Sequence, residues 1–186
     1  MINAIKIEKS YGALNALKAL SLHIPEGECY GLLGPNGAGK TTAIHILCSL
    51  LIPDGGTVHI NQIDAFAESK AVKQMIGVVP QEISLYNELS ALENLKFWGG
   101  LYGLSSSKVK ERAEWALKRT GLWDRKDDLL GTYSGGMQRR VNIASAILHS
   151  PKVLFMDEPT VGIDPQSRYH IYELIEELHA QGMTLL

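Results

Sequence analysis

The sequence of 186 residues predicts an α/β fold with a mostly parallel sheet and a helical insert. Short apolar segments typical of strands alternate with helical segments in the first third of the chain and again near its end. Between about residues 90 and 150 the periodicity is helical alone. No repeat, charge block or low-complexity linker divides the sequence. We therefore expect a single domain over residues 1–186, with a helical subdomain at roughly residues 85–150.

The strands of the first half follow from apolar alternation and from glycine and proline stops. A helix is expected from about Lys40 to Leu51, closed by Pro53 and Gly55. Pro80 stops the last strand of this half. The expected strands are "AIKIEKSYG" at residues 4–12, "LSLHIPEGE" at 20–28, "ECYGLLG" at 28–34, "GTVHINQID" at 56–64 and "MIGVVPQ" at 75–81.

The second half carries three apolar helical stripes and two strands. Gly121 has the chemistry of a helix C-cap, and Pro151 ends the second stripe. Asp164 and Pro165 have the chemistry of an N-cap and a first helical position. "KVLFMDE" at residues 152–158 is a buried strand, and "MTLL" at 183–186 begins another. The stripes are Val109, Ala113, Ala116 and Leu117; Met137, Val141, Ala144 and Leu148; and Ile171, Leu174, Ile175 and Leu178.

Composition describes an ordinary globular chain, with 45% hydrophobic and 20% charged residues. A formal net charge of −2 gives no general attraction to nucleic acid or anionic lipid. The N-terminus has no apolar signal core, and the longest apolar run, residues 43–52, is too short to span a membrane. Cys29 and Cys48 lack CxxC spacing, and their apolar neighbours predict reduced core thiols and a cytosolic setting. Any membrane role must then come through a partner.

A phosphate-binding loop is predicted at "GPNGAGKT", Gly34 to Thr41, which fits GxxxxGK[ST] at every fixed position. The loop lies between a predicted strand and a predicted helix, where backbone N–H groups and the helix N-terminus can bind phosphate oxygens. Lys40 can reach the outer phosphates, and the Thr41 hydroxyl can coordinate Mg²⁺. A glycine-rich turn before a helix is the alternative, and the flanking elements disfavour it.

An acidic pair in "VLFMDEPT" complements this loop. The buried strand delivers Asp157 and Glu158 to its C-terminal end, where ligands bind in open α/β sheets. Asp157 is suited to holding Mg²⁺, and Glu158 to polarising the water that attacks the γ-phosphate. Without the phosphate loop, an acidic pair at a strand end would be better interpreted as two solvated carboxylates than as a metal and catalytic site. Gln81, after another buried strand, could contact Mg²⁺ or that water, but alone it is an ordinary loop residue.

A second phosphate-like site opens the helix in "TYSGGMQRRVNIASA", residues 132–146. Ser134 is suited to cap this helix, and capping is the simplest explanation of the serine. Gly135 and Gly136 in the first turn argue against capping alone, since each lowers helix stability by roughly 1 kcal/mol relative to alanine. They fit a place where a ligand approaches the backbone closely.

Tyr11, "GPNGAGKTT", Gln81, "YSGGMQRR", "FMDEPT" and "VGIDP" stand in the order and spacing typical of ATP-binding cassette (ABC) ATPases. The chain resembles this family over essentially its whole length. The resemblance implies a P-loop NTPase core with a mostly parallel sheet, an N-terminal antiparallel β subdomain and an inserted helical subdomain. It also implies ATP and Mg²⁺ as cofactors and a head-to-tail dimer of two ABC ATPase domains, which sandwich ATP between them.

The resemblance also assigns roles to residues. Tyr11 would stack on adenine. Thr41, Gln81 and Asp157 would hold the metal, and Gln81 would link the site to a transport partner. Glu158 would be the catalytic base, and Asp164 would lie at the dimer seam. Ser134, Gly135 and Gly136 would bind the γ-phosphate of ATP held by the partner. The phosphates would be held by Gly34, Pro35, Asn36, Gly37, Ala38, Gly39, Lys40, Thr41 and Thr42.

Two departures from the commonest pattern refine this resemblance. Tyr133 and Met137 stand where leucine and glutamine are most common, and "YSGGM" resembles the branch of drug, antibiotic, sodium and lipid exporters. A family cassette also continues into a loop with a switch histidine, whereas this sequence ends at Leu186, and His170 and His179 precede that strand. The sequence is therefore expected to be truncated, and to bind ATP–Mg²⁺ but hydrolyse it poorly.

The expected function is an ATPase subunit that powers export by a separate polytopic membrane subunit, with the chain attached to the inner face of the cell membrane through that partner. A soluble ABC ATPase acting on ribosomes, DNA repair or iron–sulfur assembly is the alternative. No sustained heptads separate Lys40 from Asp157, which disfavours the DNA-repair type, and nucleic acid is not an expected partner. A non-hydrolysing nucleotide sensor is a third possibility, against which Glu158 argues.

Overall fold

The computed structural model describes residues 1–186, which fall into two units. The sheet unit comprises Met1–Val78, Lys152–Asp157 and Gln181–Leu186. The helical unit comprises Val79–Pro151 and Glu158–Ala180. None of the helices combines the length and apolar character needed to cross a lipid bilayer.

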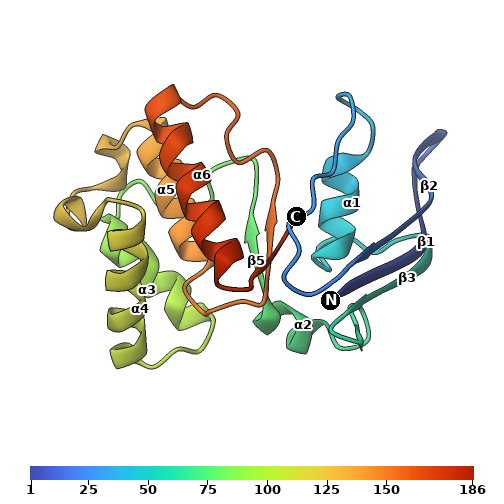
Figure 1. Ribbon diagram of the computed structural model, residues 1–186, viewed down its shortest axis with the longest axis horizontal. Coiled ribbons are helices and arrows are strands. Elements are labelled where there is room, and N and C mark those ends of the chain that lie inside the picture. Colours follow the sequence, from blue (N-terminus) through green and yellow to red (C-terminus); the bar gives the residue numbers. More distant parts are fainter. The chain divides into compact units, whose positions relative to one another are not determined.

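The sheet unit begins with a four-stranded antiparallel sheet in the order β2-β1-β3-β4 (Figure 1). Gly12, with φ of 59°, turns the chain between the first two strands. The segment 56–64, expected as one strand, is a hairpin, because Asn61 and Gln62 adopt φ of 52° and 67° as in a type I′ turn. The strands are β1 (Ile2–Tyr11), β2 (Leu14–Ile24), β3 (Gly55–Ile60) and β4 (Ile63–Asp64).

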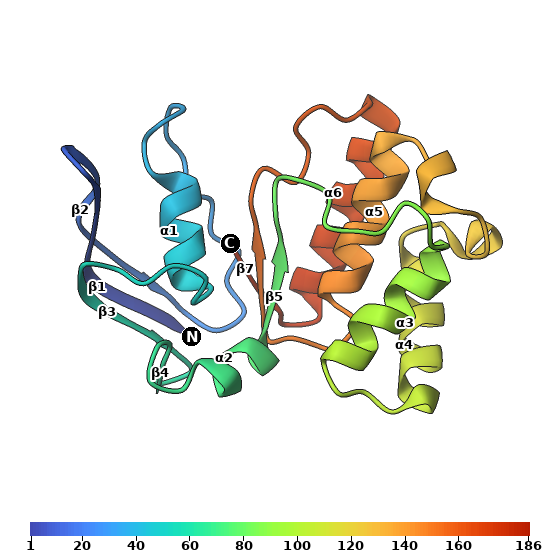
Figure 2. The same cartoon turned by 180° about the vertical axis from the view of Figure 1, so that it is seen from behind.

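Helix α1 (Lys40–Leu47) covers one face of this antiparallel sheet (Figures 1 and 2). Ile2 and Ala4 point toward it because side chains alternate along a strand, and both are buried in one core with Ile46 and Leu47 of the helix. The helix ends before the expected Leu51, since Ser49 has a left-handed φ of 58°.

A second sheet of the same unit has the order β5-β6-β7, and β6 and β7 run parallel. This confirms the expected parallel sheet, including the strand that starts in "MTLL". Segment 28–34 was expected as a full strand but pairs only through Cys29, which bridges Leu185. Helix α2, which the sequence did not predict, precedes β5. The bounds are α2 (Ser69–Met75), β5 (Ile76–Val79), β6 (Val153–Met156) and β7 (Thr184–Leu185).

The two cysteines differ in burial. Both thiols are free, and Cys48 is buried as expected. Cys29 is exposed, so its interpretation as a core thiol is wrong. The residue lies where the chain forms a single bridge instead of a strand, so its apolar neighbours do not enclose it.

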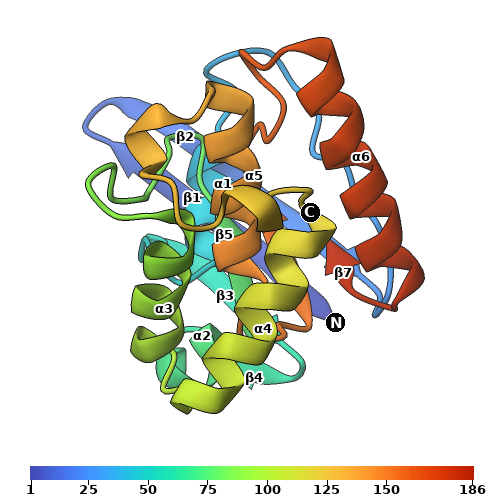
Figure 3. The same cartoon turned by 90° about the vertical axis from the view of Figure 1, so that its left-hand side faces the viewer.

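Figure 3 shows the helices of the helical unit, and residues of the α4 and α5 stripes are buried in one apolar cluster. All four stripe residues of α4 are buried, and Gly121 after it has the positive φ of a C-cap, 66°. A capping box between Ser90 and Glu93 begins α3. The helices are α3 (Ala91–Leu101), α4 (Ser106–Arg119), α5 (Gly135–Ala146) and α6 (Pro165–Ala180), with short 3₁₀ turns η1 (Trp123–Arg125) and η2 (Leu130–Thr132).

Candidate nucleotide-binding site

The predicted phosphate loop leads directly into α1. Gly37 and Gly39 adopt φ of 80° and 86°, which side chains other than glycine rarely allow. A Cβ atom added to Gly39 would lie 2.5 Å from the backbone oxygen of Ala16 and 3.0 Å from Leu17 Cδ2 on β2, whereas one added to Gly37 would meet nothing within 4 Å. Gly39 therefore holds the loop against the sheet, and Gly37 leaves the opposite side open to a ligand.

Lys40 is the first residue of α1, and its ammonium group folds over the loop. Its Nζ donates hydrogen bonds to the carbonyl oxygens of Gly34, at 3.0 Å, and Pro35, at 3.1 Å. Charged phosphate oxygens form stronger hydrogen bonds with an ammonium than neutral carbonyls do. The next residue, Thr41, is exposed in the first helical turn. The geometry suits exchange of the carbonyl contacts for contacts with phosphate.

Asp157 belongs to the same unit and directly follows β6. The residue is 4% exposed. The pKa of the Cys48 thiol is raised well above its ordinary value, first by burial and then by the charge of Asp157. A buried carboxylate is costly unless hydrogen bonds or a cation compensate it. Asp157 and the Thr41 hydroxyl are hard oxygen donors, so they fit Mg²⁺.

Tyr11 ends β1 opposite Leu14, and its side chain is 51% exposed, so its ring is open to stacking. A hollow of about 450 Å³ lies in the same unit between β2 and the phosphate loop. Its lining includes Asn15, Lys18, Leu20, Leu32, Gly37, Ala38, Gly39 and Lys40.

Glu158 and Gln81 lie together in the helical unit. Gln81 Nε2 donates a hydrogen bond to Glu158 Oε2 at 3.2 Å. Glu158 adopts a left-handed φ of 49°, which costs a non-glycine residue on the order of 1–3 kcal/mol. The structure thus joins two of the predicted site residues that are far apart in sequence.

Ser134 caps α5 by accepting a hydrogen bond from the Met137 backbone N–H at 3.3 Å. Gly135 is exposed, and an added Cβ would meet nothing within 4 Å, as a close ligand approach requires. Gly136 is buried, and an added Cβ would overlap the Ser167 side chain and lie 2.8 Å from Asp164 Oδ2. Packing against the start of α6 is therefore a second reason for glycine at position 136, and binding of phosphate by the Gly136 backbone stays a prediction.

Tyr133 and Met137 both contact Arg125. The Tyr133 hydroxyl donates to the Arg125 carbonyl oxygen at 2.5 Å, and Arg125 Nη1 lies 3.7 Å from Met137 Sδ. The Arg125 guanidinium also lies 5.1 Å from the centre of the Tyr133 ring. The two residues that depart from the commonest family pattern therefore form one local contact set beside the α5 N-terminus.

Asp164 caps α6 as expected, with Oδ1 accepting a hydrogen bond from the Ser167 backbone N–H at 2.8 Å. Hydrogen bonds from the backbone and then the side chain of Ser167 hold the pKa of the Asp164 carboxyl below its usual value. His170 is paired with Glu173 on the surface of the same helix, at 3.3 Å, and the sequence assigned it no ligand role.

The site residues are thus divided between the units. Tyr11, Gly34 to Thr42 and Asp157 belong to the sheet unit. Gln81, Glu158, Ser134 to Gly136 and Asp164 belong to the helical unit. Arg139, which the sequence did not single out, donates to the backbone of Gln81. Arg139 lies three positions after Gly136, so the two residues share one face of the helix. This spacing is the sequence signal that could have identified Arg139.

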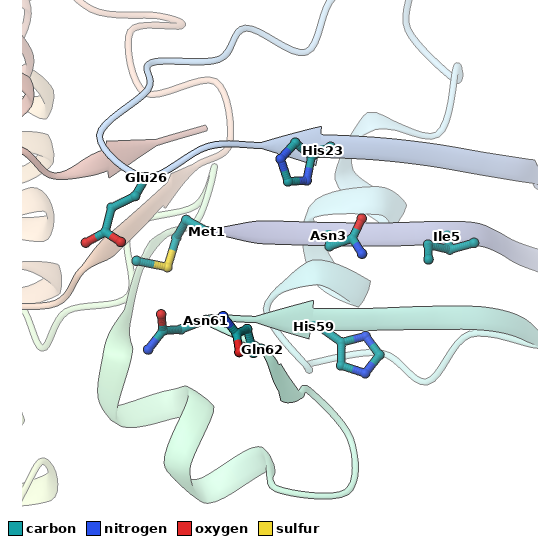
Figure 4. A pocket seen from close by; sticks show the side chains of 8 residues that line it. All are labelled: Met1, Asn3, Ile5, His23, Glu26, His59, Asn61 and Gln62. Atoms are coloured by element: carbon teal, nitrogen blue, oxygen red, sulfur yellow. The ribbon is translucent and has the colours of Figure 1, made fainter.

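Another hollow, of about 510 Å³, lies on the face of the antiparallel sheet that α1 leaves uncovered (Figure 4). Asn3 and Ile5 point to this face because they alternate with the buried Ile2 and Ala4. His23 and His59 flank Asn3 in the strand register. No group of three or more metal-binding side chains is present in the chain, and none of the predicted site residues lines this hollow.

Comparison with known proteins shows the family of the chain. A family described as ABC transporter matches residues 17–161. The chain is 48% identical over 186 residues to the linearmycin resistance ATP-binding protein LnrL of Bacillus subtilis (strain 168), covering 100% of this chain and 60% of that protein. It is 39% identical over 181 residues to the Nod factor export ATP-binding protein I of Paraburkholderia xenovorans (strain LB400), covering 97% of this chain and 60% of that protein.

Solved structures show the same fold. The dimeric structure of MJ0796, a bacterial ABC transporter cassette, superposes with a TM-score of 0.89 at 30% identity, covering 100% of this chain and 86% of that one. The chain spans about 60% of the length of the curated relatives named above. Because the family match extends over more than half of the sequence and includes the phosphate loop and the acidic pair, this chain belongs to the ABC transporter family.

Proposed function

We propose that this chain is a nucleotide-binding domain that binds ATP–Mg²⁺ and hydrolyses ATP to power export by a separate membrane subunit. The observation that carries the proposal is the loop before α1, where Gly37 and Gly39 take left-handed conformations and Lys40 lies over the loop carbonyls. Relatives named as antibiotic resistance and export ATP-binding proteins support the direction of transport.

The residues divide the chemistry among them. Lys40 and the loop N–H groups would bind phosphate oxygens, and Thr41, Asp157 and Gln81 would hold Mg²⁺. Bound Mg²⁺ would neutralise charge on the phosphates as the terminal bond breaks. Glu158 would accept a proton from the attacking water, and the Gln81 amide, which donates to its carboxylate, would set the direction of that carboxylate. Tyr11 would stack on the adenine ring.

A second copy or a related domain would complete the site. Ser134 and the open backbone at Gly135 would bind the γ-phosphate of ATP held by that partner, with Asp164 at the seam between the two domains. The solved dimers of the MJ0796 cassette support this arrangement.

A membrane subunit would dock on an exposed aromatic patch of the helical unit. Tyr86 and Phe97 are 45% and 39% exposed and meet edge to face at 5.0 Å, and Leu101, one turn further along α3, is 63% exposed. Exposed apolar groups gathered in this way are typical of interaction sites. Through this partner the chain would attach to the inner face of the membrane.

Hydrolysis and assembly test the nucleotide part of the proposal. Glu158→Gln should leave the Kd for ATP–Mg²⁺ within about twofold, lower kcat by about 10²–10⁴-fold, and form an ATP-dependent dimer in sedimentation velocity. The control is Glu88→Gln, a change at an exposed glutamate of the same unit. Unchanged turnover in Glu158→Gln would remove its role as base, and a monomer at saturating ATP would contradict the sandwich.

Affinity purification from detergent extracts of the native cells tests the partner. We expect a polytopic membrane protein to copurify with the wild type and to be lost with Phe97→Asp. Recovery of ribosomes in its place would support a soluble ABC ATPase and would remove the export function.

A further inference from the structure

Arg139 carries a charge into the interior of the helical unit. It lies on α5, and its side chain is only 6% exposed. Its guanidinium donates to two successive backbone carbonyls, with Nη1 at 2.6 Å from the Pro80 oxygen and Nη2 bonded to the Gln81 oxygen. Burial lowers the pKa of this guanidinium, and no carboxylate compensates the shift.

The chemistry of this contact favours arginine specifically. A buried charge is costly unless hydrogen bonds satisfy it, so a side chain that only filled space would be better neutral. A guanidinium presents planar N–H groups in a fixed fork, which can engage two neighbouring acceptors at once. Hydrogen bonds from a charged donor are stronger than those from a neutral one. Arg139 of α5 thus orients the two peptide groups on either side of Gln81, the one between Pro80 and Gln81 and the one between Gln81 and Glu82.

Gln81 extends this contact to the acidic pair. Its backbone is held by Arg139, and its side chain donates to Glu158 Oε2 at 3.2 Å. Arg139 also lies five residues after Ser134, or about 7.5 Å along the helix axis at the standard rise. Helix α5 therefore connects its open N-terminus to Gln81 through Arg139. The Gln81 side chain extends this connection to Glu158.

We propose that Arg139 is a positioning residue that couples displacement of the α5 N-terminus to the orientation of Gln81 and so to the carboxylate of Glu158. This inference rests on the proposed function, in which Glu158 is the base and the α5 N-terminus receives the partner's nucleotide. Arg139 acts only through the backbone of Gln81. Occupation of the α5 N-terminus would then change hydrolysis at the Glu158 of the same chain.

Arg140 is the matched control. It follows Arg139 on the same helix, its guanidinium is also partly buried, and Nη1 donates to a backbone carbonyl, that of Thr120, at 2.9 Å. Burial lowers the pKa of this guanidinium as well, and the charge of Asp164 partly offsets that shift. Its contact lies at the C-terminus of α4 and does not involve Gln81, so loss of Arg140 reports a general effect of removing a buried charge from α5.

Backbone ¹⁵N relaxation tests the tether without hydrolysis. In Arg139→Met we expect order parameters at the Gln81 and Glu82 amides to fall from about 0.85 to below about 0.6, with an intermediate value in Arg139→Lys. Arg140→Met should leave these two amides unchanged and affect Thr120 and Gly121. If Arg139→Met does not fold, Arg139→Lys decides, because its ammonium cannot reproduce the fork. Wild-type values at both amides in the folded variant would overturn the proposal.

A double-mutant cycle tests the coupling. Arg139→Met should lower kcat about tenfold, keep KM for ATP within about twofold, and be partly rescued by lysine. Added to Gln81→Ala, it should lower kcat no more than about twofold further, because both changes break one connection. Additive effects of Arg139→Met and Gln81→Ala on kcat would overturn the proposed coupling. A loss of kcat in Arg140→Met equal to that in Arg139→Met would also overturn it. If the wild type does not bind ATP–Mg²⁺, the proposed function fails. The relaxation measurement tests the contact between Arg139 and Gln81 independently of ATP turnover.

Discussion

Single residues show how one sequence pattern can serve two physical purposes. Gly135 and Gly136 are adjacent and look equivalent in the sequence, yet one faces open space and the other faces Ser167 and Asp164. Glu158 has a backbone conformation that its residue type does not predict, a left-handed φ of 49°. Strain of this kind persists only where the surrounding structure fixes it, and hydrogen bonding to Gln81 is part of that surrounding.

Alanine substitution should separate the two glycines. Gly135→Ala should leave the free energy of unfolding within about 1 kcal/mol of wild type or raise it, because the new methyl group meets no neighbour and alanine favours helix. Gly136→Ala should lower it by about 1–3 kcal/mol through overpacking against α6. Urea unfolding measures both. Equal effects on stability would show that Gly136 of α5 does not pack against the start of α6.

At the scale of elements, capping side chains fix where the functional helices begin. Ser90, Ser134 and Asp164 each accept a backbone N–H at a helix start, which places the first turn of α3, α5 and α6. The cap of α6 also carries charge near the positive end of the helix dipole. Asp164 is also a proposed residue of the dimer seam. The same side chain therefore stabilises α6 and would lie at the contact with the second domain.

The charged cap predicts a pH-dependent stability. The pKa of the folded Asp164 carboxyl is lowered, so its contribution is complete above the unfolded-state pKa of about 3.9 and is lost as the pH falls through the folded value. Asp164→Asn keeps an acceptor without the charge. The stability gap between wild type and Asp164→Asn should therefore be present at about pH 7 and shrink toward about pH 3.

Urea unfolding at several pH values between these limits measures the gap. Asp164→Ala is the control, because it also removes the acceptor and should be less stable than Asp164→Asn throughout the range. A gap between wild type and Asp164→Asn that widens in acid would contradict the assigned hydrogen bonds.

At the scale of the whole molecule, the predicted site residues are divided between the two units. The phosphate loop and Asp157 belong to one unit, and Gln81 and Glu158 belong to the other. Asp157 and Glu158 are nevertheless consecutive, so a single peptide bond joins the proposed metal ligand to the proposed base. Nucleotide bound at the phosphate loop should therefore stabilise the sheet unit that carries the loop.

Thermal unfolding with nucleotide tests this. ATP–Mg²⁺ at about 100 times its Kd should stabilise the chain by about 2.7 kcal/mol, which corresponds to a rise in Tm of about 5–10 °C for a chain of this size. Lys40→Ala should abolish the rise, whereas Lys73→Ala, an exposed lysine on α2 in the same unit, should keep it. An equal rise in Lys40→Ala would mean that nucleotide binds elsewhere.

Much of the fold could be predicted because its elements depend on local pattern. The buried stripe of α4, the cap at Asp164 and the stop at Pro80 follow from periodicity and from the chemistry of single residues. The failures depend on longer-range contacts. Segment 28–34 has strand composition but pairs only at Cys29, and residues 61–62 turn a predicted strand into a hairpin. Pairing partners and left-handed turns are decided by neighbours that apolar alternation does not encode.

The sequence by itself determined the family and the chemical groups of the site, because a phosphate loop and an acidic pair need fixed residue types at fixed spacing. Only the tertiary structure decided which groups meet. Gln81 reaches Glu158, Gly136 packs on α6 while Gly135 stays open, and Arg139 holds the backbone beside Gln81. These contacts join segments more than twenty residues apart. The role of a buried charge such as Arg139 can be inferred only from its hydrogen-bond partners, the two carbonyls that folding brings to it.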